Sequence, residues 1–148
     1  MPGVVACEML LGLSDRIAVQ LGPLAVWPQG VRLSLWLTAR KPPFLTDPFR
    51  GRDPLRGPQF GVEFPDGRRA IYRPRTLHTV VPGEGPVLWP LGGAGTGADM
   101  RWELYLWPLP AAGEMTLACR WDDQGVDETL NKIDTKPLLE AARRARPL

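Results

Sequence analysis

The sequence predicts a mainly β protein, built as a two-layer antiparallel β-sandwich of the jelly-roll or immunoglobulin-like type, with a short helical segment at the C-terminus. Apolar and polar side chains alternate strictly through five segments, proline and glycine mark the breaks between them, and helical periodicity occurs only near the end of the chain. Alternation of this kind is typical of strands with one buried and one wet face, because successive side chains point to opposite faces.

The alternating segments are the main evidence for strands. In 30–40, valine and leucine occupy the odd positions from 31 to 37, while the even positions are mostly polar. Less regular strands are expected at 4–13, 68–72 and 87–91. A total of seven or eight short strands favours a sandwich over an open sheet. The five alternating segments are 15–21, 30–40, 59–64, 101–107 and 114–121.

Turn residues divide these segments. Pro65-Asp66-Gly67 predicts a tight turn, because proline presets φ, the Asp side chain bonds locally and glycine accepts a positive φ. The run 108–113 predicts a hairpin between its two flanking strands. The glycine-rich run 91–98 predicts a second hairpin connection. A phosphate-binding loop is less favoured there, because the run lacks the Gly-Lys-Ser/Thr ending and precedes a strand.

Residues 126–146 predict a C-terminal helical appendage. The spacing of Val126, Leu130 and Ile133 fits one face of a helix. Thr135 is the expected N-cap of the last helix, since the proline two residues later would lie in the first turn, where its missing N–H costs nothing. The apolar stripe expected to dock this helix on the sandwich consists of Leu138, Ala141, Ala142 and Ala145.

The composition indicates one domain spanning 1–148. Hydrophobic residues make up 44% of the chain and the formal net charge is +2, which provides one core and no strongly basic coat. The chain lacks a secretory signal pattern and a run of about 18 apolar residues that would span a membrane. Cys7 and Cys119 predict two buried thiols in a reducing compartment, although the sequence leaves a disulfide open. We therefore expect a cytoplasmic protein without membrane contact.

The residues that carry chemistry form no recognisable catalytic or metal-binding pattern. His78 is the single histidine, Ser14 and Ser34 are the only serines, and no Gly-x-Ser-x-Gly elbow occurs. One histidine and two distant cysteines do not supply a zinc site. The sequence thus predicts no catalytic residue, no metal and no cofactor, and it favours a non-enzymatic protein. An acidic cluster does not match the spacing of a calcium loop; it consists of Asp122, Asp123, Asp127 and Glu128, around Gly125.

Three aromatic residues are candidate binding residues. Trp36, Tyr105 and Trp107 fall on strand faces opposite the leucine-rich ones. Tryptophan and tyrosine are enriched at binding surfaces and would offer a platform to a protein, a peptide or a sugar ring. The competing interpretation is that the C-terminal helix, or the Phe-containing segment 41–58, covers them.

Basic residues of the long connection 41–58 are further candidates. Arg50, Arg52 and Arg56 would form a patch for an anionic partner. Nucleic-acid binding usually shows a larger charge excess with interleaved aromatics, so a nucleic-acid partner is not favoured.

Three segments carry a resemblance to a known family. LYLWPLP at 104–110, LACRW at 117–121 and GVDET at 125–129 resemble a family of small uncharacterised proteins from actinobacteria. The resemblance extends to VWPQGVRL at 26–33 and to the glycine-rich run, and so covers most of the chain. It implies a free-standing bacterial domain and carries over no activity and no site residue.

Taken together, the sequence favours a non-enzymatic module that binds another macromolecule, most reasonably a protein. Two alternatives stay open. One is a carbohydrate-binding or carbohydrate-active sandwich that uses the same aromatic platform. The other is a small hydrolase or isomerase whose Asp/Glu pair meets only in the folded chain. The oligomeric state and the strand order are not determined by the sequence.

Overall fold

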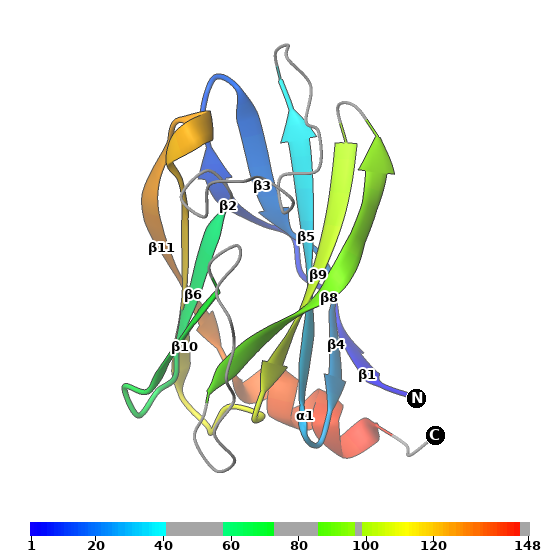
Figure 1. The fold of residues 1–148 in the computed structure, drawn as a ribbon. Helices are drawn as coiled ribbons and strands as arrows, with labels where there is room; N and C mark the ends of the chain where they lie inside the picture. The colour runs from blue at the N-terminus through cyan, green and yellow to red at the C-terminus, as the bar shows by residue number, and fades with distance from the viewer. Residues whose placement is uncertain (41–57, 73–85, 97–98, 146–148) are drawn as a thin grey trace.

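The computed structural model describes residues 1–40, 58–72, 86–96 and 99–145, which form two stacked antiparallel sheets and one short helix (Figure 1). The predicted mainly β, two-layer sandwich with a C-terminal helical segment is confirmed. Sheet A contains β1 (Gly3–Val5), β2 (Met9–Leu13), β3 (Ile17–Leu21), β4 (Leu24–Trp27), β5 (Gly30–Ala39), β8 (Val87–Thr96) and β9 (Asp99–Trp107). Sheet B contains β6 (Gln59–Glu63), β7 (Arg69–Tyr72), β10 (Glu114–Trp121) and β11 (Val126–Asp134).

The long strand β5 organises sheet A. One edge of β5 pairs with β9, and the hairpin β8–β9 completes that side of the sheet. The other edge is shared: β4 pairs with the start of β5 and β3 with its end, so β3 and β4 behave as one strand interrupted at Gly22 and Pro23. The short strands β1 and β2 pair with β4 and β3 and form the outer edge.

Sheet B has the order β11-β10-β6-β7. Two of its pairings, β10–β11 and β6–β7, join consecutive strands, whereas β6–β10 joins strands that are far apart in the sequence. The pairing of β5 with β9 is the corresponding long-range contact in sheet A. The described part of the chain therefore crosses between the two layers several times.

The core lies between the sheets and follows the alternation predicted from the sequence. The register sets Val31 opposite Leu106 and Leu33 opposite Leu104, and all four side chains are buried. Sheet B contributes the buried side of β10, including Trp121, which is 1% exposed. Burial of large apolar side chains at roughly 1.5–3 kcal/mol each is the main stabilising contribution to such a sandwich.

Hydrogen bonds from side chains join the two sheets along one edge. The Thr129 hydroxyl on β11 donates to the Leu11 carbonyl on β2. The Ser14 hydroxyl donates to the Gln124 carbonyl over 2.7 Å. Because these bonds connect the edge strand of sheet A to sheet B, they hold that side of the sandwich closed.

One predicted turn is confirmed and one predicted hairpin is wrong. Gly67 has a φ of 90°, and the Asp66 carboxylate accepts the Arg68 backbone N–H over 3.0 Å, as expected for the turn between β6 and β7. The connection 108–113 is not a hairpin, because β9 belongs to sheet A and β10 to sheet B. Alternation on both sides identified the strands, but alternation carries no information about which layer a strand joins.

The prediction of a helical segment over 126–146 is wrong for its first half. Residues Val126–Asp134 form β11, paired with β10 along its length. Val126, Leu130 and Ile133 were assigned to one helix face, yet Leu130 is 66% exposed and points away from the half-buried Ile133. The strand buries Thr129, Asn131 and Ile133 only partly, and this weak period of two was hidden by polar residues on both faces.

Helix α1 (Lys136–Arg144) packs across the end of the sandwich at which β4 ends (Figure 1). The predicted stripe is confirmed for Leu138, Ala141 and Ala142, which are buried. Gly3 of β1 lies against the helix backbone, where a Cβ atom would overlap the Ala141 carbonyl.

Thr135 connects the start of α1 to the rest of the fold. It occupies the N-cap position, as expected, but its side chain makes no cap hydrogen bond. Instead, its hydroxyl donates to the Ala111 carbonyl over 2.8 Å and accepts the Gly113 N–H over 2.9 Å. The Asp134 carboxylate accepts the N–H of the first helical residue over 2.9 Å.

Gly3→Ala is expected to lower the free energy of unfolding by about 1–3 kcal/mol, because the added methyl group overpacks the contact with α1. Gly61→Ala is the matched control, since its Cβ would make ordinary contacts, the nearest being 3.6 Å from the Ala118 Cβ, and its effect should stay within about 0.5 kcal/mol. Urea unfolding measures both. Equal effects would contradict the close packing of α1 on β1.

Candidate functional site

Four of the six tryptophans, together with Tyr105, lie on the outer face of sheet A. Directly opposed residues of an antiparallel pair point to the same side of the sheet. The pairs Leu33–Leu104 and Leu35–Trp102 face the core, so residues of the other parity face outward. We call this surface the aromatic face; it consists of Trp27, Trp36, Trp89, Tyr105 and Trp107.

Most of the aromatic face forms one cluster. Tyr105 stands opposite Arg32 on one side and opposite Trp89 on the other. Trp27 contacts Tyr105, with ring centroids 6.4 Å apart and ring planes at 53°. Trp107 follows Tyr105 by two residues on β9 and therefore occupies the next position on the same face.

Three of the four tryptophans of the aromatic face are exposed. Trp36 is 42% exposed, Trp89 46% and Trp107 40%. Trp27 and Tyr105 are half-buried, and burial raises the pKa of the Tyr105 hydroxyl. Large exposed aromatic side chains on one face are unusual unless they are covered by a partner.

Two glycines position rings of the aromatic face close to the backbone. A Cβ atom on Gly30 would overlap the Tyr105 ring, and a Cβ atom on Gly22 would overlap the Trp36 indole. Gly22 lies at the interruption between β3 and β4, so the indole covers backbone that has no side chain of its own. Tyr105 and Trp36 therefore also support the sheet, while Trp89 and Trp107 are exposed at 46% and 40% on the same face.

Arginines accompany the rings. The Arg101 guanidinium lies 5.1 Å from the centroid of Trp36 and is held by Glu103, with Nη2 to Oε1 at 3.0 Å. The Arg32 guanidinium lies 5.7 Å from the centroid of Trp27. The Arg32 Nε is buried and has no hydrogen-bond partner among the residues that the structure describes. Arginine over indole is a favourable arrangement that also leaves guanidinium N–H groups for a ligand.

The structure brings two of the predicted aromatic residues together and separates the third. Tyr105 and Trp107 belong to the cluster, whereas Trp36 lies four residues beyond Arg32 on β5, or about 13 Å along the strand. Helix α1 packs on β1 and β4 and leaves Trp36 exposed, so the helix is not its cover. The segment 41–58 lies almost entirely outside the described residues, and so do Arg50, Arg52 and Arg56.

Trp27 and Trp89 were missed as candidates. Both precede proline, and neither lies in one of the five alternating segments. Trp89 is paired with Tyr105 and faces the same side of the sheet, because the register of the β8–β9 hairpin shifts by one residue between Pro90 and Gly92. That shift is not readable from alternation. Trp27 could have been found from the two-residue turn that pairs it with Gly30.

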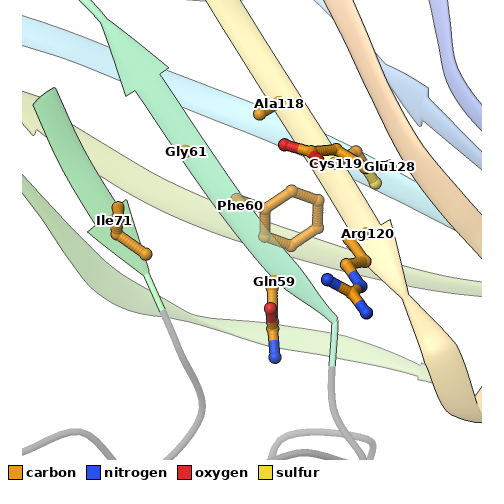
Figure 2. Close-up of a pocket in the computed structure, with 8 residues that line it drawn as sticks. All are labelled: Gln59, Phe60, Gly61, Ile71, Ala118, Cys119, Arg120 and Glu128. Atoms are coloured by element: carbon orange, nitrogen blue, oxygen red, sulfur yellow. The ribbon is translucent and has the colours of Figure 1, made fainter.

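A second surface feature lies on the outer face of sheet B. One apolar row crosses all four strands, in the order Ile71, Gly61, Ala118 and Leu130. Its small central residues form the floor of a groove of about 350 Å³ between Ile71 and Leu130. Figure 2 shows one end of this face, where Gln59 and Arg120 lie to one side of Gly61 and Ala118 and Glu128 lies near Arg120.

The described carboxylates do not form a buried acid–base pair. The buried polar residues of the described ranges are Ser34 and Thr135. Glu63 and Glu128, which line the groove of sheet B, are half-exposed and exposed, and Glu63 is ion-paired with Arg69 at 3.0 Å. No group of three or more metal-ligating side chains gathers among residues 1–40, 58–72, 86–96 and 99–145.

The two thiols are both free in the structure. Cys119 is buried in the core beside Gly12 and Val126, and burial raises its pKa to about 12. Cys7 is half-buried, and burial also raises its pKa. Because the thiolate is the reactive form, neither environment activates a nucleophile.

The described residues contain no helix long and apolar enough to cross a membrane. Comparisons of the chain with protein-family models, with curated proteins and with solved structures find no match. The resemblance to the actinobacterial family therefore stays a prediction.

Cys119 is expected to resist alkylation in the native protein. At pH 8, four units below a pKa of about 12, only about one Cys119 thiol in ten thousand is ionised, and the site is also inaccessible. Cys7 should react first, and both should react in denaturant. Iodoacetamide labelling followed by peptide mass spectrometry measures this, and rapid native labelling of Cys119 would contradict the described core.

Proposed function

We propose that this protein is a non-enzymatic binding module that holds a protein partner on the aromatic face of sheet A. The observation that supports the proposal is the exposure of Trp89 and Trp107, at 46% and 40%, beside Trp27 and Tyr105 on one surface of a rigid sheet. Tryptophan, tyrosine and arginine are the residues that most often dominate the energy of protein interfaces.

The chemistry of the face favours a mixed apolar and polar partner. The rings provide apolar area, while Arg32 and Arg101 provide hydrogen-bond donors at two positions along it. Sheet strands hold these side chains at fixed spacing, so little conformational entropy is lost when a partner binds. A protein surface that presents apolar side chains together with backbone carbonyls or carboxylates matches this arrangement.

A carbohydrate is the second candidate, because aromatic rings beside polar residues also bind sugars. Gln20 and Arg101 flank Trp36 in one row, which would suit a sugar ring stacked on the indole. Against this candidate, Trp27 and Tyr105 are inclined at 53° and offer no flat platform for a polymer. The described residues give the Asp/Glu hydrolase no support, since none of their carboxylates is buried.

We place the protein in the cytoplasm. Cys7 and Cys119 are both free thiols, which agrees with a reducing compartment. In that compartment a protein partner is more accessible than an extracellular polysaccharide.

Replacing the exposed tryptophans is expected to abolish partner capture. The tagged protein, Trp89→Ser, Trp107→Ser and the control Ile71→Ser are used to capture proteins from the source cells, with quantitative mass spectrometry. Ile71 is a matched control, because it is 53% exposed but lies on the opposite sheet. A specific partner should fall at least about tenfold with either tryptophan variant and stay constant with Ile71→Ser.

Two results would contradict this proposal. Retention of the partner by both tryptophan variants would remove the aromatic face from the interface. If no partner is captured and a glycan panel quenches tryptophan emission, with the response lost in Trp36→Ser, the carbohydrate alternative is correct.

A further inference from the structure

We infer that the outer face of sheet B is a self-association surface, on which a second copy of this chain docks by inserting Leu130 over Gly61 of its mate. This inference is independent of the aromatic face, which lies on the other sheet. It depends on the residues that three neighbouring strands, β11, β10 and β6, present to solvent.

A protruding side chain, Leu130 (the knob), and a position without a side chain, Gly61 (the hole), lie in the same row of this face. Leu130 on β11 is 66% exposed, and it stands opposite Ala118 on β10, which in turn stands opposite Gly61 on β6. The knob and the hole therefore flank the central strand at equal spacing, about 4.8 Å on either side. Gly61 and Ala118 line the groove of about 350 Å³, which is larger than a leucine side chain.

The symmetry that matches knob to hole follows from this placement. A two-fold axis above β10 and parallel to it exchanges β11 of one copy with β6 of the other. Leu130 of each copy then lies over Gly61 of its mate, while the two Ala118 side chains meet near the axis and allow close approach. Such isologous contacts are the usual way in which identical chains form closed dimers.

The neighbouring row adds charge complementarity under the same operation. Lys132 on β11 stands opposite Thr116, which stands opposite Glu63 on β6. The two-fold axis therefore sets Lys132 of each copy over Glu63 of its mate. In the row on the other side of Ala118 it brings the two Arg120 side chains together, and each of these stays ion-paired with Asp122 of its own chain at 2.8 Å. Lys132 and Glu63 now bind Glu114 at 3.3 Å and Arg69 at 3.0 Å, in exposed ion pairs that cost little to rearrange.

The size of the face sets the strength of the contact. Three strands at about 4.8 Å and five residues at about 3.3 Å give a patch of roughly 15 by 16 Å. This is small beside the roughly 800 Å² per partner of a standard interface. We therefore expect a weak dimer that dissociates on dilution. Because the sheets lie back to back, the dimer would present its two aromatic faces on opposite outer sides.

Sedimentation equilibrium from low micromolar to millimolar protein tests the inference. The expected result is a monomer–dimer equilibrium whose Kd rises at least about tenfold in Leu130→Asp and in Gly61→Val, because each change acts at both symmetric contacts. A Cβ at position 61 makes only ordinary contacts, the nearest 3.6 Å from the Ala118 Cβ, and valine is favoured in strands.

Val4→Asp is the matched control, because Val4 is 62% exposed but lies on β1 of sheet A, away from the outer face of sheet B. Its Kd should not change. Glu63→Lys should weaken the dimer, and adding Lys132→Glu should restore it. A monomer at every concentration, equal losses for Val4→Asp and Leu130→Asp, or no rescue by the charge exchange would overturn the inference.

Discussion

The constraint on which the rest of this structure depends is the burial of one side of each strand between the sheets. Leu33 and Leu35 of β5 and Leu104 of β9 face inward, so the residues that alternate with them along each strand face outward. The aromatic face is therefore a direct consequence of the register between β5 and β9. In sheet B the same rule turns Leu130 and Gly61 outward, since Leu117 and Val62 face the core.

Glycine decides how closely the outer side chains approach the backbone. Gly30 and Gly22 allow Tyr105 and Trp36 to lie against the sheet, which gives these rings a share in stability as well as in surface chemistry. The nearest atoms at Gly30 and Gly22 include those of Tyr105 and Trp36, whereas Trp89 and Trp107 lie on the same face at 46% and 40% exposure.

The sequence was sufficient for properties that depend on one strand at a time. Strict alternation located β3, β5, β6, β9 and β10 and placed Trp36, Tyr105 and Trp107 on the outer side. It was insufficient where several strands act together. The sequence did not predict β11, because neither face of that strand is fully buried. It did not identify Trp89, because the register of the β8–β9 hairpin shifts at Pro90. The apolar row of sheet B was also missed, because its residues come from four different strands. Which strands pair depends on residues that are far apart in the sequence, and the alternation within one strand does not determine it.

The most direct test compares neighbours on β9 that point to opposite sides. The free energy of unfolding would be measured by urea for Leu106→Ala and Trp107→Ala, whose wild-type side chains are 0% and 40% exposed. The account predicts a loss of about 2–5 kcal/mol for Leu106→Ala and less than about 1 kcal/mol for Trp107→Ala, because only the first creates a cavity. A loss for Trp107→Ala as large as that for Leu106→Ala would show that the ring belongs to the core, and the outer face of sheet A would then not be a binding surface.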